Sequence, residues 1–191
     1  MTPPTGRLAR LRERLAQHQP RTDDDPSLMW AAVAIVLTPD PDAILLIRRA
    51  ERTGDRWSSH MALPGGRREP GDLDLLTTAI RETSEEMGFL LRPEDLAGTL
   101  DDVVPRIPVL PPIAVRPFVF TPAVRPQFVL NPEVADARWV RLDGLLQPES
   151  RRRAQVEIPG GSREVEAYHF EDAIVWGMTE RILSSLVAVL T

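Results

Sequence analysis

The chain has 191 residues, of which 42% are hydrophobic and 27% are charged, and its formal net charge is −5. These values are typical of a domain with a hydrophobic core, and the acidic balance excludes a protein that coats nucleic acid. No stretch approaches the roughly 18 consecutive apolar residues of a membrane helix, and the absence of cysteine excludes disulfides, thiolate metal sites and a cysteine nucleophile.

The first element expected in chain order is a short helix over residues 7–17, because Leu8, Leu11 and Leu15 recur at helical spacing. A polar stretch over residues 20–26 follows, and we expect it to be a linker. The opening residues lack the apolar core of a signal peptide. Because the lack of cysteine is also compatible with a reducing compartment, we expect a cytoplasmic protein.

Two apolar runs then predict a buried hairpin. Residues 30–37 (WAAVAIVL) and 43–47 (AILLI) are unbroken apolar runs of strand length. Such runs are typical of strands that are buried on both faces. The proline- and aspartate-rich residues 39–42 between them predict the turn.

A helix is predicted from about Leu73 to Met87, with Asp72 as its N-cap and Gly88 as the left-handed residue that ends it. On a helical projection, three glutamates share one side and the opposite side is expected to pack on a sheet. The acidic side carries Glu82, Glu85 and Glu86, and the packing side carries Leu76, Ile80, Thr83 and Met87.

The rest of the chain predicts more strands than helices. Strands are expected at 100–104, 113–121 and 137–140, a helical turn at 142–146, a hairpin of 156–158 with 165–170, and a closing helix over 173–190 capped by Asp172. The predicted class is α/β, with a mixed β-sheet between helical layers. We expect residues 1–26 to form an N-terminal helix and linker and residues 27–191 to form a single domain.

The three glutamates indicate a binding site only when they are considered together with the glycine pair that precedes the helix. Each like-charge pair on an exposed helix costs only ~0.2–0.5 kcal/mol, so the acidic side by itself is compatible with a solvated face. However, Gly65 and Gly66 come before the helix. Glycines let backbone N–H groups approach phosphate oxygens, and Mg²⁺ prefers oxygen ligands and bridges to phosphates. The loop and helix together predict a site for a divalent metal and a phosphate ester.

This segment resembles the Nudix box of the Nudix hydrolases. That box reads glycine, five residues, glutamate, seven residues, Arg-Glu, an aliphatic residue, any residue, Glu-Glu, any residue, glycine and an aliphatic residue. The chain differs in Asp72 in place of the first glutamate, in the eight residues that separate it from Arg81, and in Thr83 in place of the aliphatic residue. It matches at Gly66, Arg81, Glu82, Glu85, Glu86, Gly88 and Phe89.

The resemblance implies a Nudix-type α/β/α sandwich with a mixed β-sheet, and it implies a role for each matched residue. Glu82, Glu85 and Glu86 would be ligands of Mg²⁺ or Mn²⁺, and Arg81 would orient the glutamates. One glutamate, or a separate loop carboxylate, would act as the base. The catalytic candidates are Arg81, Glu82 and Glu85, and the substrate-binding candidates are Arg48, Arg49, Gly65, Gly66 and Arg67.

Other segments are similar to the coenzyme A diphosphatase branch of this family. They are the longer box with its aspartate, residues 45–50 (LLIRRA) and residues 175–179 (VWGMT). The upstream signature is imperfect, because Ser59 stands in place of a glycine and Leu63 in place of a phenylalanine. The similarity implies hydrolysis of coenzyme A or its derivatives to 4′-phosphopantetheine and adenosine 3′,5′-bisphosphate.

Two alternative functions stay open. In the first, the enzyme acts on ADP-ribose, nucleotide sugars or dinucleoside polyphosphates instead of coenzyme A. In the second, the chain is a non-catalytic Nudix module that senses a nucleotide. In each case we expect a small nucleoside diphosphate derivative as the partner, no nucleic acid and no membrane. A homodimer is a further expectation, because it is the commonest soluble oligomer.

Three residues outside the box have two interpretations each. His60 is either catalytic or makes a structural hydrogen bond. Glu133 is either a late acid that reaches the metal or a turn residue after Pro132. Trp176 either belongs to the core or forms a platform for the substrate.

Overall fold

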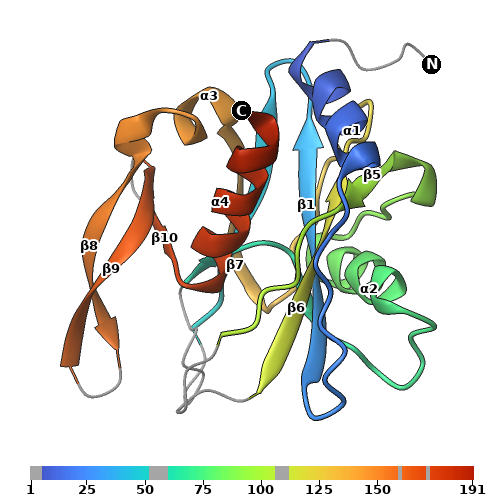
Figure 1. Cartoon of the computed structure of the whole chain (residues 1–191), viewed down its shortest axis with the longest axis horizontal. Coiled ribbons are helices and arrows are strands. Elements are labelled where there is room, and N and C mark those ends of the chain that lie inside the picture. The colour runs from blue at the N-terminus through green and yellow to red at the C-terminus, as the bar shows by residue number, and fades with distance from the viewer. Residues whose placement is uncertain (1–5, 52–59, 106–111, 159–160, 171–172) are drawn as a thin grey trace.

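The computed structural model describes residues 6–51, 60–105, 112–158, 161–170 and 173–191 (Figure 1). Its elements in chain order are α1 (Arg7–Gln17), β1 (Met29–Thr38), β2 (Ala43–Arg49), β3 (Met61–Ala62), β4 (Gly65–Arg67), α2 (Leu75–Met87), the 3-10 turn η1 (Pro93–Asp95), β5 (Leu96–Thr99), β6 (Ile113–Phe120), β7 (Val134–Arg141), α3 (Leu142–Leu145), the 3-10 turn η2 (Pro148–Ser150), β8 (Arg151–Ile158), β9 (Gly161–Phe170), β10 (Ala173–Trp176) and α4 (Met178–Leu190).

A seven-stranded sheet is the centre of the fold. Its strands are ordered β3-β2-β1-β6-β5, and β4 also pairs with β1 and β7 with β2. Strands β1 and β6 run parallel, whereas the other pairs of this sheet are antiparallel. The predicted mixed sheet is therefore confirmed.

Helices cover both faces of this sheet. Leu11 of α1 and Leu186 of α4 join Ile35 of β1 in one hydrophobic core. Ala79 and Met87 of α2 belong to a second core on the other face. Figure 1 shows α4 and α2 on opposite sides of β1, which is the predicted α/β/α sandwich. Among the described residues, no helix combines the length and the apolar character needed to cross a membrane.

The two apolar runs form the predicted hairpin, in which Leu37 pairs with Ile44. Their side chains alternate between the two cores. Ile35 and Leu37 pack on the side of α1 and α4, and Ala34 and Val36 pack on the side of α2. Since successive side chains of a strand point to opposite faces, a strand covered on both sides must be apolar throughout.

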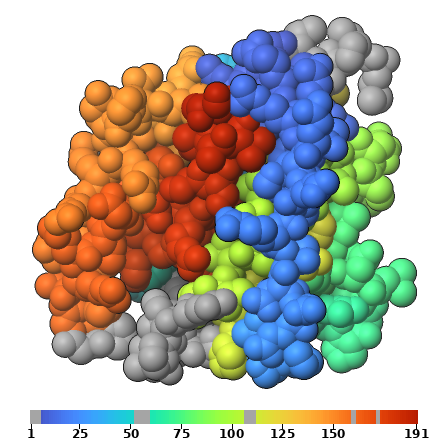
Figure 2. Space-filling view, in the orientation of Figure 1, coloured from blue at the N-terminus to red at the C-terminus, as the bar shows by residue number. Residues whose placement is uncertain are grey.

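The residues after α1 are tied to the segment that follows β5. The Arg21 Nε donates a hydrogen bond to Asp101 (2.6 Å), and the Asp23 backbone N–H donates to Asp102 (2.8 Å). Arg116 of β6 donates to the same Asp102 carboxylate (2.8 Å). In Figure 2 the blue atoms of this segment cross the face of the molecule below α1.

The prediction of a strand over residues 100–104 was wrong. Within this range Val103 pairs with β6, through an isolated bridge to Val115. The strand that pairs antiparallel with β6 is β5, which ends before residue 100. The reason lies in Asp101 and Asp102, whose carboxylates bind the arginines described above. Side-chain hydrogen bonds from such residues compete with a regular ladder.

Helix α2 begins slightly later than expected, at Leu75. Its N-cap is Asp74, whose carboxylate accepts a hydrogen bond from the Thr77 backbone N–H at 2.7 Å. The prediction of Asp72 as the cap was therefore wrong. Gly88 ends the helix in the left-handed region (φ 69°), as predicted.

The predicted closing helix over residues 173–190 is a strand followed by a helix. Strand β10 pairs with β9, and Gly177, with φ 72°, separates it from α4. The β-branched Ile174 and Val175 favour the strand, which the apolar pattern alone did not reveal. Asp172, the predicted cap, lies outside the described residues.

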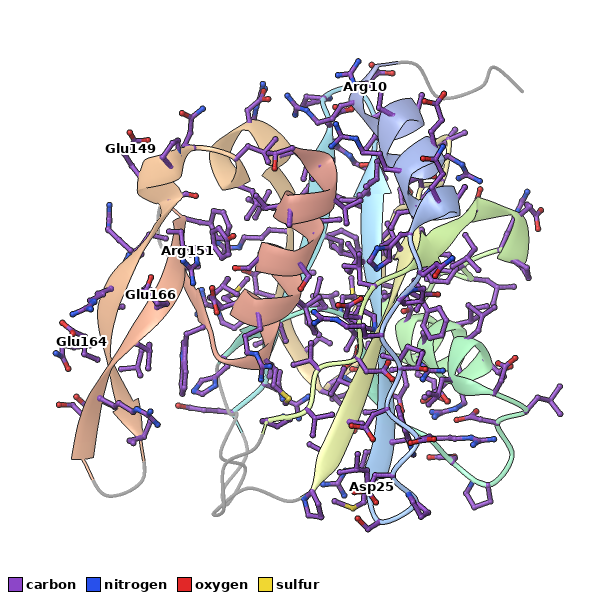
Figure 3. All side chains as sticks on the ribbon, in the orientation of Figure 1. Arg10, Asp25, Glu149, Arg151, Glu164 and Glu166 are labelled. Carbon is purple, nitrogen blue, oxygen red and sulfur yellow. The ribbon has the colours of Figure 1, made fainter. Side chains whose placement is uncertain are left out.

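Strands β8, β9 and β10 form a separate three-stranded sheet that projects from the body of the molecule (Figure 1). The hairpin predicted from 156–158 and 165–170 is present, with longer strands than expected. Arg151 anchors it, because its Nε donates to Glu180 of α4 at 2.8 Å and its Nη1 lies 3.6 Å from Glu166 (Figure 3).

Candidate active site

The glycine pair forms strand β4, in which Gly65 pairs with Val33 and Gly66 with Ala32 of β1. At Gly65, where φ is 148°, an added Cβ would lie 2.2 Å from the Ala32 carbonyl oxygen. At Gly66, an added Cβ would lie 2.4 Å from the Glu82 carboxylate. The first glycine therefore lets the loop lie on the sheet, and the second lets Glu82 reach the backbone of the loop.

Glu86 is buried, with only 4% of its surface exposed. Its Oε2 accepts a hydrogen bond from the Gly65 backbone N–H at 2.9 Å. Burial raises the pKa of Glu86 to about 7, and the negative charges of Glu82 and Glu133 add to the rise. The expectation that all three glutamates share a side facing away from the packed face was therefore wrong for Glu86, which the helix presents to the loop.

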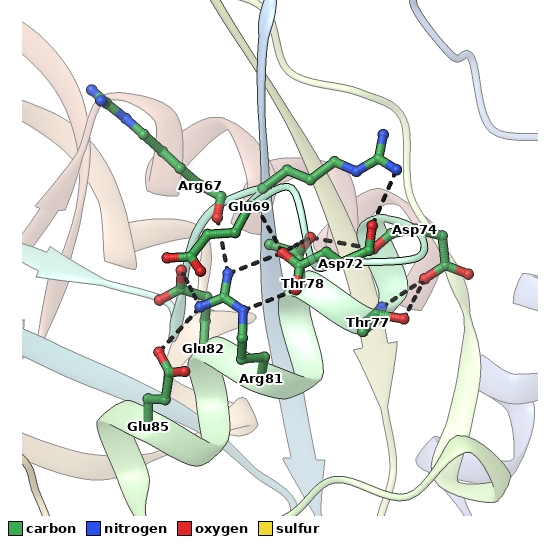
Figure 4. A network of polar contacts seen from close by, with 10 residues as sticks. Arg67, Glu69, Asp72, Asp74, Thr77, Thr78, Arg81, Glu82 and Glu85 are labelled. Carbon is green, nitrogen blue, oxygen red and sulfur yellow. Dashed lines mark hydrogen bonds and ion pairs between the residues drawn. The ribbon is translucent and has the colours of Figure 1, made fainter.

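Arg81 lies at the centre of the network in Figure 4. Its Nη1 is 3.1 Å from Glu82 Oε1 and 3.1 Å from Glu85 Oε2, and the second of these is an i,i+4 pair. Its Nη2 donates to the Arg67 carbonyl oxygen at 3.0 Å. One guanidinium thus connects the loop to two of the three glutamates. Burial raises the pKa of Glu82, and the positive charge of Arg81 opposes that rise.

Asp72 holds Arg81 in place. Its buried carboxylate accepts two hydrogen bonds from that guanidinium, from Nε at 2.9 Å and from Nη2 at 3.0 Å. It also accepts from the Thr78 hydroxyl and from the Glu69 backbone N–H, both at 2.9 Å. The hydrogen bonds from Arg81 hold the pKa of Asp72 well below its ordinary value. The residue that departs from the box therefore supports the helix through Arg81.

Asp72→Asn is expected to lower the free energy of unfolding by about 3 kcal/mol, because it leaves a guanidinium without its buried partner. In the wild type, the lowered pKa means that this stabilisation is complete above the ordinary value of 3.8 and is lost as the pH falls below it. The acid side of the stability curve should therefore be shallower in the variant. Urea unfolding at pH 7 and pH 3 measures both effects, and an unchanged pH dependence would contradict this role.

The donor set fits a hard divalent cation, although it is not gathered into a closed cage. In the part of the chain that the structure describes, no group of three or more Asp, Glu or His side chains is arranged to hold a metal, and Arg81 lies between Glu82 and Glu85. Mg²⁺ keeps several waters and needs only one or two carboxylates. Glu86 is buried beside the negative charges of Glu82 and Glu133. A bound cation would stabilise the charged form of its carboxylate.

The three predicted substrate-binding arginines have different surroundings. The positive charge of Arg49 lowers the pKa of Glu86, which places it near the glutamates. Arg48 lines a cleft beside β10, together with His60 and Trp176. The Arg67 side chain is exposed, and its backbone carbonyl is the group that contacts the network.

Three further positions complete the site. Thr83 is fully buried and donates its hydroxyl to the Ala79 carbonyl oxygen at 2.7 Å, so it fits where the box has an aliphatic residue. Glu69 lies beside Glu82, and its charge raises the pKa of that residue (Figure 4). The sequence analysis did not single out Glu69, although its position in the loop between the glycines and the helix could have indicated it. The charge of Glu133 also raises the pKa of Glu86, so Glu133 lies near the cluster, and its role as a late acid stays a prediction.

Comparison with protein families gives one match of direct relevance. A model described as the NUDIX domain matches residues 28–173. The uncharacterized protein C14C4.10c of Schizosaccharomyces pombe is 41% identical over 119 residues, which cover 60% of this chain and 36% of that protein. The mitochondrial coenzyme A diphosphatase NUDT8 of Mus musculus is 33% identical over 106 residues, covering 53% of this chain and 50% of that protein. The chain thus spans half or less of the length of these two relatives.

A third relative and two solved structures extend over more of the chain. The uncharacterized Nudix hydrolase NudL of Yersinia pestis is 28% identical over 155 residues, covering 81% of this chain and 75% of that protein. A MutT/nudix family protein from Enterococcus faecalis superimposes with a TM-score of 0.58 at 16% identity, covering 93% of this chain and 67% of the other. A NUDIX hydrolase from Alicyclobacillus acidocaldarius gives 0.55 at 19% identity, covering 86% and 93%. At these identities the two structures support the fold alone.

Proposed function

The chain belongs to the Nudix family, and we propose that it is a diphosphatase that depends on a divalent metal and hydrolyses coenzyme A or its derivatives. The observation that carries the diphosphatase activity is the fit between loop and helix. Gly65 donates to the buried Glu86, and Gly66 leaves room for Glu82 against the same loop. This unit brings carboxylates and a glycine backbone together, as a metal shared with a diphosphate requires.

The reaction adds one water across the P–O–P bridge. The water oxygen joins one phosphorus, and the bridging oxygen leaves with the other phosphate, so that two monophosphates form. When bound, a divalent cation supplies neutralisation of the developing charge and lowers the pKa of water. Arg81 orients Glu82 and Glu85 through its contacts with both carboxylates. A carboxylate of the cluster accepts the proton that the water loses.

Support for coenzyme A comes from segments outside the box. Residues 45–50 form the end of β2 and lead to the cleft that Arg48 lines, and residues 175–179 join β10 to α4 beside it. Both segments are similar to the coenzyme A diphosphatase branch. One relative with a stated substrate, the mouse protein, is a coenzyme A diphosphatase. ADP-ribose, nucleotide sugars and dinucleoside polyphosphates are the competing substrates.

A substrate panel tests this proposal. The full chain is incubated with coenzyme A, acetyl-coenzyme A, ADP-ribose, a nucleotide sugar and a dinucleoside polyphosphate, each with Mg²⁺ or Mn²⁺. Mass spectrometry should detect 4′-phosphopantetheine and adenosine 3′,5′-bisphosphate from coenzyme A, with the highest kcat/KM of the panel. Faster turnover of another substrate would reassign the specificity, and tight binding without any turnover would indicate a sensing module.

A further inference from the structure

A cleft of about 370 Å³ lies between the large sheet and the small sheet. Its wall on the large sheet is the end of β2 and the start of β3, and its other wall belongs to β8 and β10. Its volume falls within the range of small-molecule sites, about 300–1,000 Å³. The lining residues are Arg48, His60, Met61, Val156, Glu157, Ala173, Ile174 and Trp176.

The Arg48 side chain supplies positive charge in this cleft. It is half-buried, and in the described part of the chain it makes no side-chain hydrogen bond or ion pair. Glu157 lines the same cleft but forms no ion pair with it. A guanidinium has five N–H donors in a planar fork that matches a phosphate group. A half-buried fork without a partner of its own is therefore suited to an anionic ligand.

Aromatic and apolar groups form the rest of the cleft. The ring of Trp176 lies 4.7 Å from that of His60, centroid to centroid, at an interplanar angle of 56°. Trp176 is half-buried, and Ile174 beside it is 41% exposed. A partly exposed indole above an apolar floor offers a stacking surface to a base. The carboxylate of Glu157 only accepts hydrogen bonds, which suits the amino group of adenine.

We propose that this cleft binds the nucleotide end of the substrate, with the adenine base against Trp176 and a 3′-phosphate on Arg48. The pantetheine end carries neither a ring nor a charge, so the chemistry of the cleft favours the nucleotide. The distance is suitable as well. Met61 and Gly65 are four residues apart, so this wall of the cleft comes within about 13 Å of the loop that holds Glu86. A nucleotide in the cleft can place its diphosphate at that loop.

This inference rests on the proposed function, and kinetics with two substrates test it. Arg48→Gln should lower kcat/KM for coenzyme A by about 10- to 100-fold, the loss expected for a hydrogen bond to a charged group. Turnover of 3′-dephospho-coenzyme A, which lacks the 3′-phosphate, should change by less than about threefold. Arg48→Lys should recover part of the loss. Arg10→Gln is the matched control, because Arg10 is exposed on α1 away from the small sheet (Figure 3).

A binding experiment separates this inference from the proposed function, since it needs neither metal nor turnover. Adenosine 3′,5′-bisphosphate should quench tryptophan fluorescence and bind at least about tenfold more tightly than 5′-AMP. Arg48→Gln should remove that difference, and Trp176→Phe should remove most of the quenching while keeping the affinity. Equal affinity of the wild type for both nucleotides, or unchanged discrimination in Arg48→Gln, would overturn the inference even if coenzyme A is hydrolysed. Inactivity toward coenzyme A with this discrimination intact would overturn only the proposed function.

Discussion

Glu86→Gln is expected to lower kcat about 1,000-fold while the protein stays folded. The glutamine oxygen can still accept the hydrogen bond from the Gly65 backbone N–H, so the loop keeps its anchor. What the variant loses is the charge of a candidate metal ligand. Metal-assisted stabilisation of a transition state amounts to several kcal/mol, and each 1.36 kcal/mol corresponds to a factor of ten in rate.

The stability of the metal-free protein gives this prediction a second readout. Because burial raises the pKa of Glu86 to about 7, its contribution to stability is complete below the ordinary value of 4.5 and is lost as the pH rises through 7. Metal-free Glu86→Gln should therefore be at least as stable as the wild type at pH 8. Mn²⁺ should raise the Tm of the wild type and leave that of the variant unchanged.

Glu94→Gln is the control for Glu86→Gln. Glu94 is an exposed glutamate in η1, and the same change of charge there should leave kcat, stability and the Mn²⁺ response as in the wild type. Near-normal turnover of Glu86→Gln would refute the assignment of Glu86 as a ligand. A variant that loses its fold would show that the buried charge is needed for structure.

Alanine at the two neighbouring glycines is expected to produce two different defects. In Gly65→Ala the new Cβ meets the Ala32 carbonyl oxygen at 2.2 Å, and φ is 148°. Neither the sheet backbone nor this dihedral can adjust easily, so we expect a loss of about 2–4 kcal/mol in the free energy of unfolding. In Gly66→Ala the new Cβ meets the end of the Glu82 side chain, which can turn away.

Gly66→Ala should therefore keep its stability to within ~1 kcal/mol and lose activity, because Glu82 is displaced. A misplacement of about 1 Å at a catalytic group can cost about 100-fold in rate. Urea unfolding and steady-state kinetics on both variants test the contrast. The geometry would be contradicted if Gly66→Ala kept full activity, or if both variants showed the same loss of stability.

The parts of the fold and site that follow from local rules could be predicted from the sequence. The unbroken apolar runs gave β1 and β2, because a strand covered on both faces is apolar throughout. The contact between Arg81 and Glu85 follows from i,i+4 spacing, and the left-handed end at Gly88 from its missing side chain. The assignment of the glutamates as metal ligands stays a prediction that the variants above test.

The parts that depend on tertiary contacts could not be predicted in this way. Asp72 and Asp74 are both good caps by composition, and only the folded loop shows that Asp72 is engaged by Arg81. Helical periodicity grouped Glu86 with the other two glutamates. The pattern of residues along the helix carries no information about the Gly65 backbone N–H that donates to the Glu86 carboxylate. The apolar residues on either side of Asp101 and Asp102 predict a strand there, whereas Arg21, the partner of Asp101, is distant in sequence.

The pairing of the glycine loop with β1 has a consequence for which substitutions the site can tolerate. That strand pairs with β4 on one part of its length and with β6 along most of it, so the loop of Gly65 and Gly66 is fixed to the centre of the large sheet. The small sheet that lines the cleft mainly contacts α4 and β3 instead of β1. Substitutions in β8 and β10 are therefore expected to change the cleft without altering the β1–β4 register that positions Gly65 and Gly66.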